Sequence, residues 1–311
     1  MHGVSATRPS NSLGLLRAPT GQTSAQGLMA ASAVLFGIQG VFAELAYDNG
    51  ASVGVVLALR AAVFSLLGLF LLDPARRATL HGHWRVLSIA CFTSIAGPLL
   101  YYGALASMQP TTVTLIVFLY PALTIVGARL LGRIHLSALA IGVTAVTMIG
   151  VALAVGAPVG GVNLIGVLLA LSSSFVFSIY FLAAEHGLEG VDPLAWLGVT
   201  VIAAAVVLVP VAPLLGISLP NGRGFAAILM IAIGCSLVPC LLQTAGLMRL
   251  GSAAATLVAT VEIATVVVAS TLILGQRPTP LAVIGAVLVI IGAACAPMAM
   301  RDRLRPPTTT L

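Results

Sequence analysis

Ten long apolar stretches, separated by short polar connections, occupy nearly all of the chain from residue 27 onward. A hydrocarbon core about 30 Å thick is crossed by about 20 apolar residues in helical form. Backbone groups in hydrocarbon must be paired within their own segment, so each stretch is predicted to be a membrane-spanning helix. We expect the spans at residues 27–47, 52–72, 85–108, 111–131, 137–156, 164–185, 193–215, 225–248, 252–274 and 281–300.

The charge content excludes a water-soluble globular domain. Only 7% of the residues are charged, 59% are hydrophobic, and the mean hydropathy is +1.14. Soluble domains carry about 25% charged residues, so lipid must cover most of this surface. The apolar runs are continuous rather than short and alternating, which argues against a membrane β-barrel. The expected fold is therefore an all-α polytopic membrane protein in a lipid bilayer.

Both ends of the chain are predicted to be tails. Residues 1–26 are polar and rich in Ser, Thr and Gly, which is typical of a disordered segment. The apolar run that follows exceeds the roughly 7–15 residues of a signal-peptide core, so it is interpreted as a retained first span. Residues 301–311 form the second expected tail.

Arginine supplies all 14 basic residues, and its distribution predicts the orientation of the chain. Cytoplasmic loops of membrane proteins carry the excess of basic residues. With a cytoplasmic N-terminus, eleven arginines fall inside: Arg8, Arg17, Arg76, Arg77, Arg85, Arg129, Arg133, Arg249, Arg301, Arg303 and Arg305. Only Arg223 and Arg277 fall outside, and Arg60 lies within a span. Both termini are thus expected in the cytoplasm, and the scattered arginines offer no basic face for nucleic acid.

Two parts of the sequence resemble each other at a nearly constant separation. Pro98 and Pro239 occupy matching places in the third and eighth spans. The fourth and ninth spans each end in a Leu-Gly pair, at 131–132 and at 274–275. These two pairs are separated by nearly the same length of chain as the two prolines. Because five spans is an odd number, the second copy must cross the membrane in the opposite sense. We therefore expect two inverted five-helix repeats, at residues 27–157 and 158–300, with a substrate site between them.

Several short motifs occur in order on this scaffold: Leu-Ala-Leu-Arg at 57–60, Tyr-Tyr-Gly-Ala-Leu at 101–105, Tyr-Pro at 120–121 and Val-Glu at 261–262. With them the chain resembles the EamA-type transporters of the drug/metabolite transporter superfamily, from about residue 27 to residue 298. The resemblance implies export of amino acids, other small metabolites or drugs across a bacterial inner membrane.

The sequence departs from the pattern of that family at three positions. Many members have Leu-Gly-Glu after the fourth and ninth spans, whereas Arg133 and Gln276 stand here at the third position. The proline that commonly follows the ninth-span glutamate is replaced by Ile263. The resemblance therefore assigns no coupling role at these positions.

Two charged residues are expected near the middle of the bilayer. Arg60 lies eight residues into the second span and Glu262 ten residues into the ninth. A charge at this depth costs about 2.5–3.5 kcal/mol or more, so it usually faces a cavity or a partner. One interpretation is that Arg60 binds a substrate carboxylate while Glu262 binds a cationic group or a proton. The alternative is that each residue only fixes its helix to a neighbour.

Four uncharged polar residues within the spans are further candidates to line a substrate cavity: Gln39, Tyr101, Tyr120 and Gln243. Pro98 and Pro239 each remove a backbone hydrogen bond and kink their helices, so they are either gating hinges or static bends. Glu44 lies close to the outer end of the first span, and we expect it at the membrane interface.

The sequence gives no support to an enzyme or a cofactor protein. All five histidines lie in loops or tails, and there is no H-E-x-x-H, G-x-S-x-G or P-loop motif. The four cysteines lie in apolar runs without metal-ligand spacing, so neither a disulfide nor a zinc site is expected. The predicted function is secondary-active transport of a small molecule by alternating access, with protons as the candidate coupling ion. A non-transporting scaffold or lipid-handling protein and an intramembrane enzyme are the alternatives, and both a monomer and a homodimer are left open.

Overall fold

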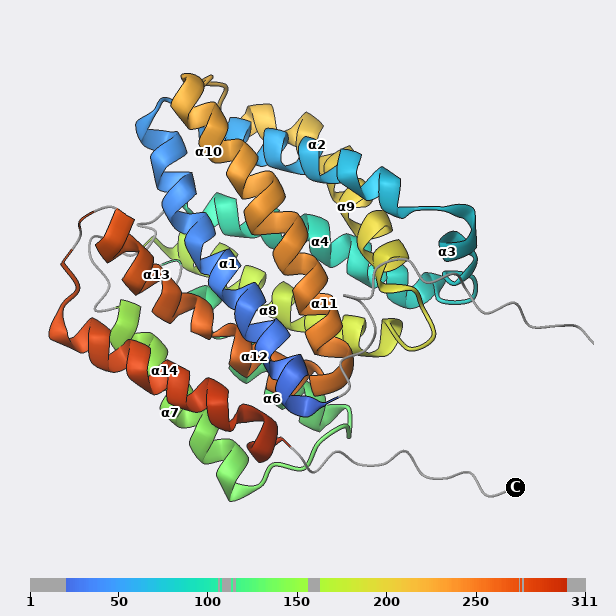
Figure 1. The fold of residues 1–311 in the computed structure, drawn as a ribbon, viewed down its shortest axis with the longest axis vertical. Coiled ribbons are helices and arrows are strands. Elements are labelled where there is room, and N and C mark those ends of the chain that lie inside the picture. Colours follow the sequence, from blue (N-terminus) through green and yellow to red (C-terminus); the bar gives the residue numbers. More distant parts are fainter. Residues whose placement is uncertain are drawn as a thin grey trace, which may run out of the picture.

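The computed structural model describes residues 21–105, 107, 113, 116–155, 163–273, 275 and 277–300. These residues form a bundle of helices without an extended strand (Figure 1). The helices are α1 (Gln22–Asp48), α2 (Val53–Leu71), α3 (Pro74–Ala78), α4 (Trp84–Leu105), α6 (Tyr120–Leu130), α7 (Ala138–Val155), α8 (Leu164–Gly187), α9 (Pro193–Val211), α10 (Gly222–Ala232), α11 (Val238–Leu250), α12 (Ser252–Ala259), α13 (Val261–Ile273) and α14 (Pro280–Ala299). A 3-10 turn, η2 (Ala212–Leu215), ends the seventh span, and a π-helical turn, η3 (Ile233–Leu237), joins α10 to α11.

Each of the ten predicted spans contains a helix of the structure. Eight helical stretches of the described chain are long and apolar enough to cross a membrane: α1, α2, α4, α8, α9 with η2, α10 through α11, α12 with α13, and α14. The fifth predicted span corresponds to the shorter apolar helix α7. The fourth corresponds to α6, whose predicted beginning lies largely outside the described residues. The prediction of an all-helical polytopic membrane protein is confirmed.

The first helix starts earlier than the sequence indicated. It begins at Gln22 rather than at residue 27, so the predicted tail extends too far into the chain. Two glutamine side chains explain the longer helix: Gln22 donates to Pro297 O at 3.1 Å and Gln26 donates to Ala293 O at 2.9 Å, both in α14. The start of α1 therefore lies beside the end of α14, at the same end of the bundle. The rest of both predicted tails lies outside the described residues.

A short helix that the sequence did not indicate, α3, lies between the second and third spans. Asp73 accepts a hydrogen bond from the Arg76 amide at 2.8 Å, and Pro74 occupies the first helical position of α3. Both features are favourable at a helix start.

Equivalent helices of the two repeats run antiparallel where they meet. At one end of the pair formed by α2 and α9, Gly54 approaches the backbone of Ala212. At the other end, Gly198 lies so close to Gly68 that a Cβ atom built on Gly198 would be 3.0 Å from Gly68 O. The start of α2 thus lies against the end of α9, with glycines permitting the close approach.

The same geometry joins α7 to α14, which lie side by side in Figure 1. A side-chain carbon added to Gly150, late in α7, would lie 2.9 Å from Gly285 O, early in α14. Thr147 meets Gly292 further along the same pair. Two antiparallel pairs of equivalent helices are what an inverted repeat requires.

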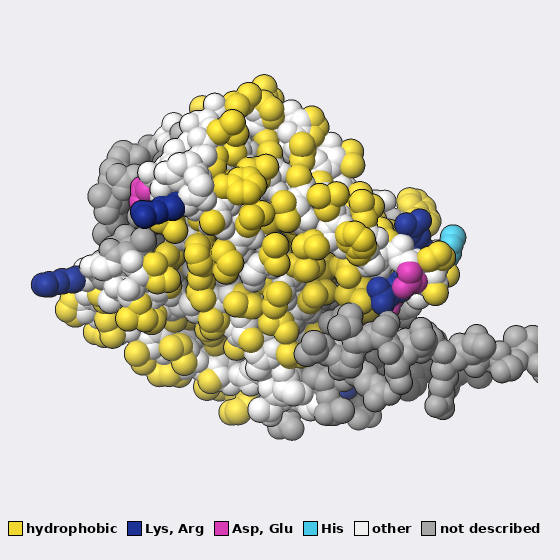
Figure 2. Space-filling view, turned by 45° about the horizontal axis from the view of Figure 1, so that its top comes forward, with side chains coloured by type: hydrophobic (Ala, Val, Ile, Leu, Met, Phe, Trp, Pro, Cys, Tyr) yellow, Lys and Arg dark blue, Asp and Glu magenta, His cyan; other side chains and the backbone are white. Residues whose placement is uncertain are grey.

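Helices from one repeat pack mainly against helices from the other. α1 packs on α11 and α13, while α4 packs on α8 and α9. Figure 2 shows the outer surface from one side, where hydrophobic side chains cover most of the face and charged side chains gather near its opposite edges. This distribution suits a bundle whose middle is in contact with lipid. The interface between the repeats consequently forms the interior of the protein.

Candidate functional site

Arg60 extends from the middle of α2 to the eighth span. Its Nε donates to Ser236 Oγ at 2.8 Å. Ser236 is fully buried, and its hydroxyl donates in turn to Ile231 O at 2.7 Å. A charged group in an apolar interior is stable only when it is hydrogen-bonded or paired. Ser236, which the sequence alone does not mark as a site residue, supplies that partner.

A break in the eighth span places Ser236 in this position. The π turn η3 interrupts the α-helical geometry and is followed at once by Pro239 in the first turn of α11. Proline has no N–H, so the carbonyl of Cys235, four residues earlier, loses its α-helical donor. π turns inside α-helices occur frequently at functional sites.

Gln39 of α1 occupies the space between the break and Arg60. In the amide orientation that satisfies both ends, its nitrogen donates to Cys235 O at 2.8 Å. Its oxygen then accepts from Arg60 Nη1 at 3.2 Å. The structure therefore joins two of the predicted site residues, Arg60 and Gln39, in one polar cluster with Ser236 and the Cys235 carbonyl.

Glu262 stands at a second break, in the ninth span. α12 ends at Ala259, Thr260 forms a turn, and α13 places Glu262 in its first turn. The positive end of a helix dipole favours a carboxylate at this position. α1 passes very close here, because a side-chain carbon added to Gly37 would lie 2.6 Å from Glu262 O. Half-helices that begin inside the membrane are typical of the substrate sites of transporters.

Arg60 and Glu262 lie within electrostatic range of each other, on helices from opposite repeats. Among the ion pairs that the described residues form, none joins these two side chains within 4.0 Å. Both side chains are half-buried. The bundle therefore holds two opposite charges that are not in direct contact.

Tyr120 lies in an aromatic cluster at the start of α6. Its ring stacks on Phe181 at 5.6 Å between centroids and contacts Phe118 at 5.7 Å and Phe177 at 6.3 Å. Tyr120 is 7% exposed, and it lies within electrostatic range of Glu262. The fourth span is also broken just before this residue, by a turn at 118–119. The break corresponds in the repeat to the one at Thr260.

The remaining sequence candidates lie on α11, α4 and α1. Gln243 is half-buried in α11 and has no hydrogen bond to another described residue. Tyr101, in α4, packs against Leu57 of α2 and Leu208 of α9. The side chain of Glu44 lies outside the described part of the chain.

Two buried serines tie the proline segments in the same way in each repeat. Ser32 of α1 donates to Pro239 O at 2.7 Å, and Ser173 of α8 donates to Gly97 O, next to Pro98, at 3.0 Å. The two serines are separated by the same length of chain as the two prolines. The sequence alone does not reveal which carbonyl the Ser173 hydroxyl meets.

Another polar cluster lies at one end of the bundle. Arg133 Nη1 donates to Leu182 O at 2.7 Å and lies 3.3 Å from Glu185 Oε2. Ser252 Oγ donates to the same carboxylate oxygen at 2.6 Å. The ends of the fourth, sixth and ninth spans are thereby joined. Glu185 has no role that the sequence could indicate, because residues far apart in the chain form this cluster.

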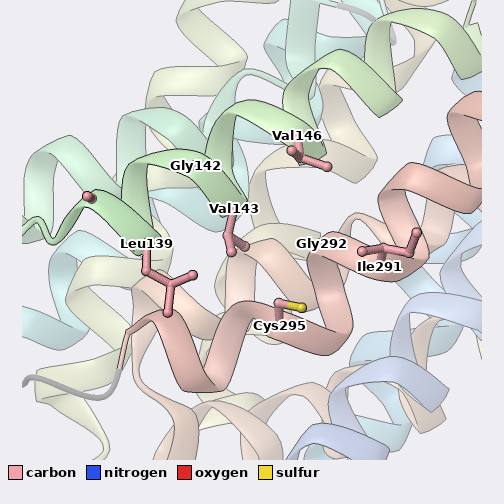
Figure 3. Close-up of a pocket in the computed structure, with 8 residues that line it drawn as sticks. Leu139, Gly142, Val143, Val146, Ile291, Gly292 and Cys295 are labelled. Carbon is pink, nitrogen blue, oxygen red and sulfur yellow. The ribbon is translucent and has the colours of Figure 1, made fainter.

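An open apolar hollow of about 280 Å³ lies elsewhere, between α7 and α14. Figure 3 shows Leu139, Val143 and Val146 on one side and Ile291 and Cys295 on the other. None of the predicted site residues lines it. Its lining is almost entirely apolar, so it does not contribute to the polar site.

Together, the spanning helices and antiparallel repeats define a polytopic membrane protein built from two related halves. A model of the EamA-like transporter family matches residues 23–156 and again residues 164–296, so the chain belongs to that family of membrane transporters. No curated protein matches the chain. A solved structure titled "Crystal structure of protein" is similar over 91% of this chain and 100% of its own length, with a TM-score of 0.78 and 17% identity. At that identity the likeness shows the fold alone.

Proposed function

We propose that this protein is a secondary-active exporter of small metabolites that carry both a carboxylate and an amino group, with amino acids as the leading class. The observation that carries the proposal is the placement of Arg60 and Glu262. These opposite charges lie on opposite repeats, close to helix breaks, inside a bundle of otherwise apolar spans. A charge at such depth in a membrane protein is by default a functional candidate.

The contacts of Arg60 leave room for a carboxylate. Its Nε and Nη1 are held by Ser236 and Gln39, whereas Nη2 has no hydrogen bond to a described residue. A guanidinium carries five N–H donors in a fixed plane and binds carboxylates with two parallel hydrogen bonds. The edge formed by Nη1 and Nη2 therefore still has donors for a substrate.

Glu262 supplies the complementary chemistry. An ionised carboxylate attracts an ammonium group, and it can release that group when it takes up a proton. Exchange of a proton for the substrate amino group at Glu262 would couple export to the proton gradient. Tyr120 of the aromatic cluster lies within electrostatic range of this carboxylate, and the cluster provides ring faces that also attract cations.

Alternating access needs elements that bend, and the spans offer several. Pro98 lies inside α4 and Pro239 follows the π turn of the eighth span. We assign both prolines as hinges that let the two sides of the site open in turn. Breaks in the fourth and ninth spans add flexibility next to the aromatic cluster and Glu262.

The proposed location is a bacterial inner membrane with both termini in the cytoplasm. The excess of arginine in the connections on one side supports this orientation. The contact between Gln22 and Pro297 supports only the placement of both termini on one side, because it brings the start of the first span and the end of the last span together.

Efflux from intact cells tests the proposal. Cells that overproduce the protein are loaded with a ¹⁴C-labelled mixture of L-amino acids, and the loss of label is followed after dilution. We expect faster loss than from cells with an empty vector, and loss at the vector rate with Arg60→Gln or Glu262→Gln. Arg85→Gln, outside the cluster, is the control that should keep full efflux. Efflux at the vector rate for the well-expressed wild-type protein would favour a non-transporting scaffold.

A further inference from the structure

The contacts around Arg60 give specific roles to residues that do not themselves carry a charge. We propose that Ser236 and Gln39 are positioning residues that fix the orientation of the Arg60 guanidinium and tie it to the π turn of the eighth span. This inference rests on the proposed function in one respect, namely that Arg60 binds the carboxylate of a substrate.

The directions of the hydrogen bonds support this role. The single proton of the Ser236 hydroxyl is donated to Ile231 O, so the hydroxyl oxygen faces Arg60 as an acceptor. An arginine side chain has hydrogen-bond donors only, so an acceptor whose direction is fixed also fixes the direction of the guanidinium N–H that bonds to it. The Gln39 amide is held in the same manner, because its nitrogen is engaged by Cys235 O.

Two hydrogen bonds to different nitrogens determine the plane of a guanidinium. Ser236 binds Nε and Gln39 binds Nη1, from two different spans. Rotation of the guanidinium out of this plane would break both bonds. The edge left for a substrate is therefore presented in one direction, which lowers the entropy cost of binding a carboxylate.

The π turn ties this arrangement to the shape of the eighth span. Both contacts of the span with the cluster, Ser236 Oγ and Cys235 O, belong to the five residues of η3. In an α-helix successive residues are about 100° apart around the axis, at about 3.6 residues per turn. Conversion of η3 to α geometry would therefore redirect Ser236 relative to Arg60. Movement at the adjacent Pro239 and release of the guanidinium are expected to occur together.

Chemical modification of Arg60 tests the positioning without any substrate. Phenylglyoxal attacks a guanidinium through its two terminal nitrogens, and mass spectrometry of the peptide that contains Arg60 gives the rate of modification in the purified full-length protein. We expect Ser236→Ala to raise this rate about tenfold, because a charge-assisted hydrogen bond to Nε is lost. Ser236→Thr, which keeps the hydroxyl, should restore the slow rate. Ser65→Ala removes a hydroxyl from the same helix as Arg60 and should change nothing.

Transport in proteoliposomes supplies the second measurement, with the ¹⁴C-labelled mixture of L-amino acids as the probe. Ser236→Ala should raise the half-saturating concentration about tenfold while the maximal rate stays within about twofold, since orientation rather than turnover is affected. An unchanged phenylglyoxal rate in Ser236→Ala would overturn the inference, whatever the transport result. A faster modification together with wild-type half-saturation in both Ser236→Ala and Arg60→Gln would support the positioning and refute the proposed carboxylate site.

Discussion

The hydroxyl of Ser32 donates a 2.7 Å hydrogen bond to the carbonyl oxygen of Pro239. Its counterpart Ser173 donates to the carbonyl oxygen of Gly97, the residue before Pro98, at 3.0 Å. The first and sixth spans are therefore fastened to the proline segments of the eighth and third spans by the same chemistry. An inverted repeat that preserves such a detail indicates that both proline segments need lateral support.

Loss of these hydroxyls should weaken the bundle. Ser32→Ala and Ser173→Ala are each expected to lower the free energy of unfolding by about 1 kcal/mol, because a buried carbonyl loses a donor. The effects should be close to additive, since the two sites share no contact. Thermal unfolding of the purified protein in detergent measures the change. Ser88→Ala, whose exposed hydroxyl bonds only to Trp84 of its own helix, is the matched control.

The hinge assignment predicts a separation of rate from stability. Pro98→Ala combined with Pro239→Ala should slow the maximal efflux rate, because the added N–H groups allow straighter and stiffer helices. Expression and melting temperature should stay close to the wild-type values. Efflux at the wild-type rate in the double variant would identify the prolines as static bends.

The cluster of Arg133, Glu185 and Ser252 predicts a local contribution to stability. Glu185→Gln should lower the free energy of unfolding by about 1–2 kcal/mol, since Arg133 is left without its counter-charge in a partly buried position. Glu189→Gln is the control, because its contact with His186 is largely exposed and exposed ion pairs contribute little. Equal melting temperatures for the two variants would show that the cluster does not hold the three spans together.

Proton coupling depends on Glu262. Glu262→Gln preserves the size of the side chain and removes its ability to bind and release a proton. The variant should insert and fold normally but lose proton-driven efflux, so that an imposed pH gradient no longer accelerates the flux. Efflux with the wild-type pH dependence in this variant would reduce Glu262 to a structural residue and make Arg60 the leading candidate.

The proposed orientation is tested independently of transport. Reporter domains fused after Arg17 and after Arg305 should both give a cytoplasmic signal. A periplasmic signal at either fusion would contradict an even number of spans with cytoplasmic ends.

The sequence predicted the spans well because hydropathy alone decides which segments enter lipid. It located Arg60 and Glu262 for the same reason, since charges are conspicuous in apolar runs. The break at Thr260 was missed, because it contains neither Gly nor Pro. Ser236 was missed as well, because its importance comes from a π turn that brings it to a residue 176 positions earlier in the chain. Contacts between repeats depend on packing, which a single sequence does not display.

The bond between Arg60 and Ser236 also has a consequence for the order of synthesis. The two residues are 176 positions apart, so at about 5–20 residues per second the ribosome needs about 10–35 s to supply the serine after the arginine. During that interval the second span carries the charge of Arg60, and burying such a charge costs about 2.5–3.5 kcal/mol or more. Of the two hydrogen-bond partners of Arg60, only Gln39 has been synthesised by then. The second span therefore enters the membrane before the Ser236 partner of its arginine has been synthesised.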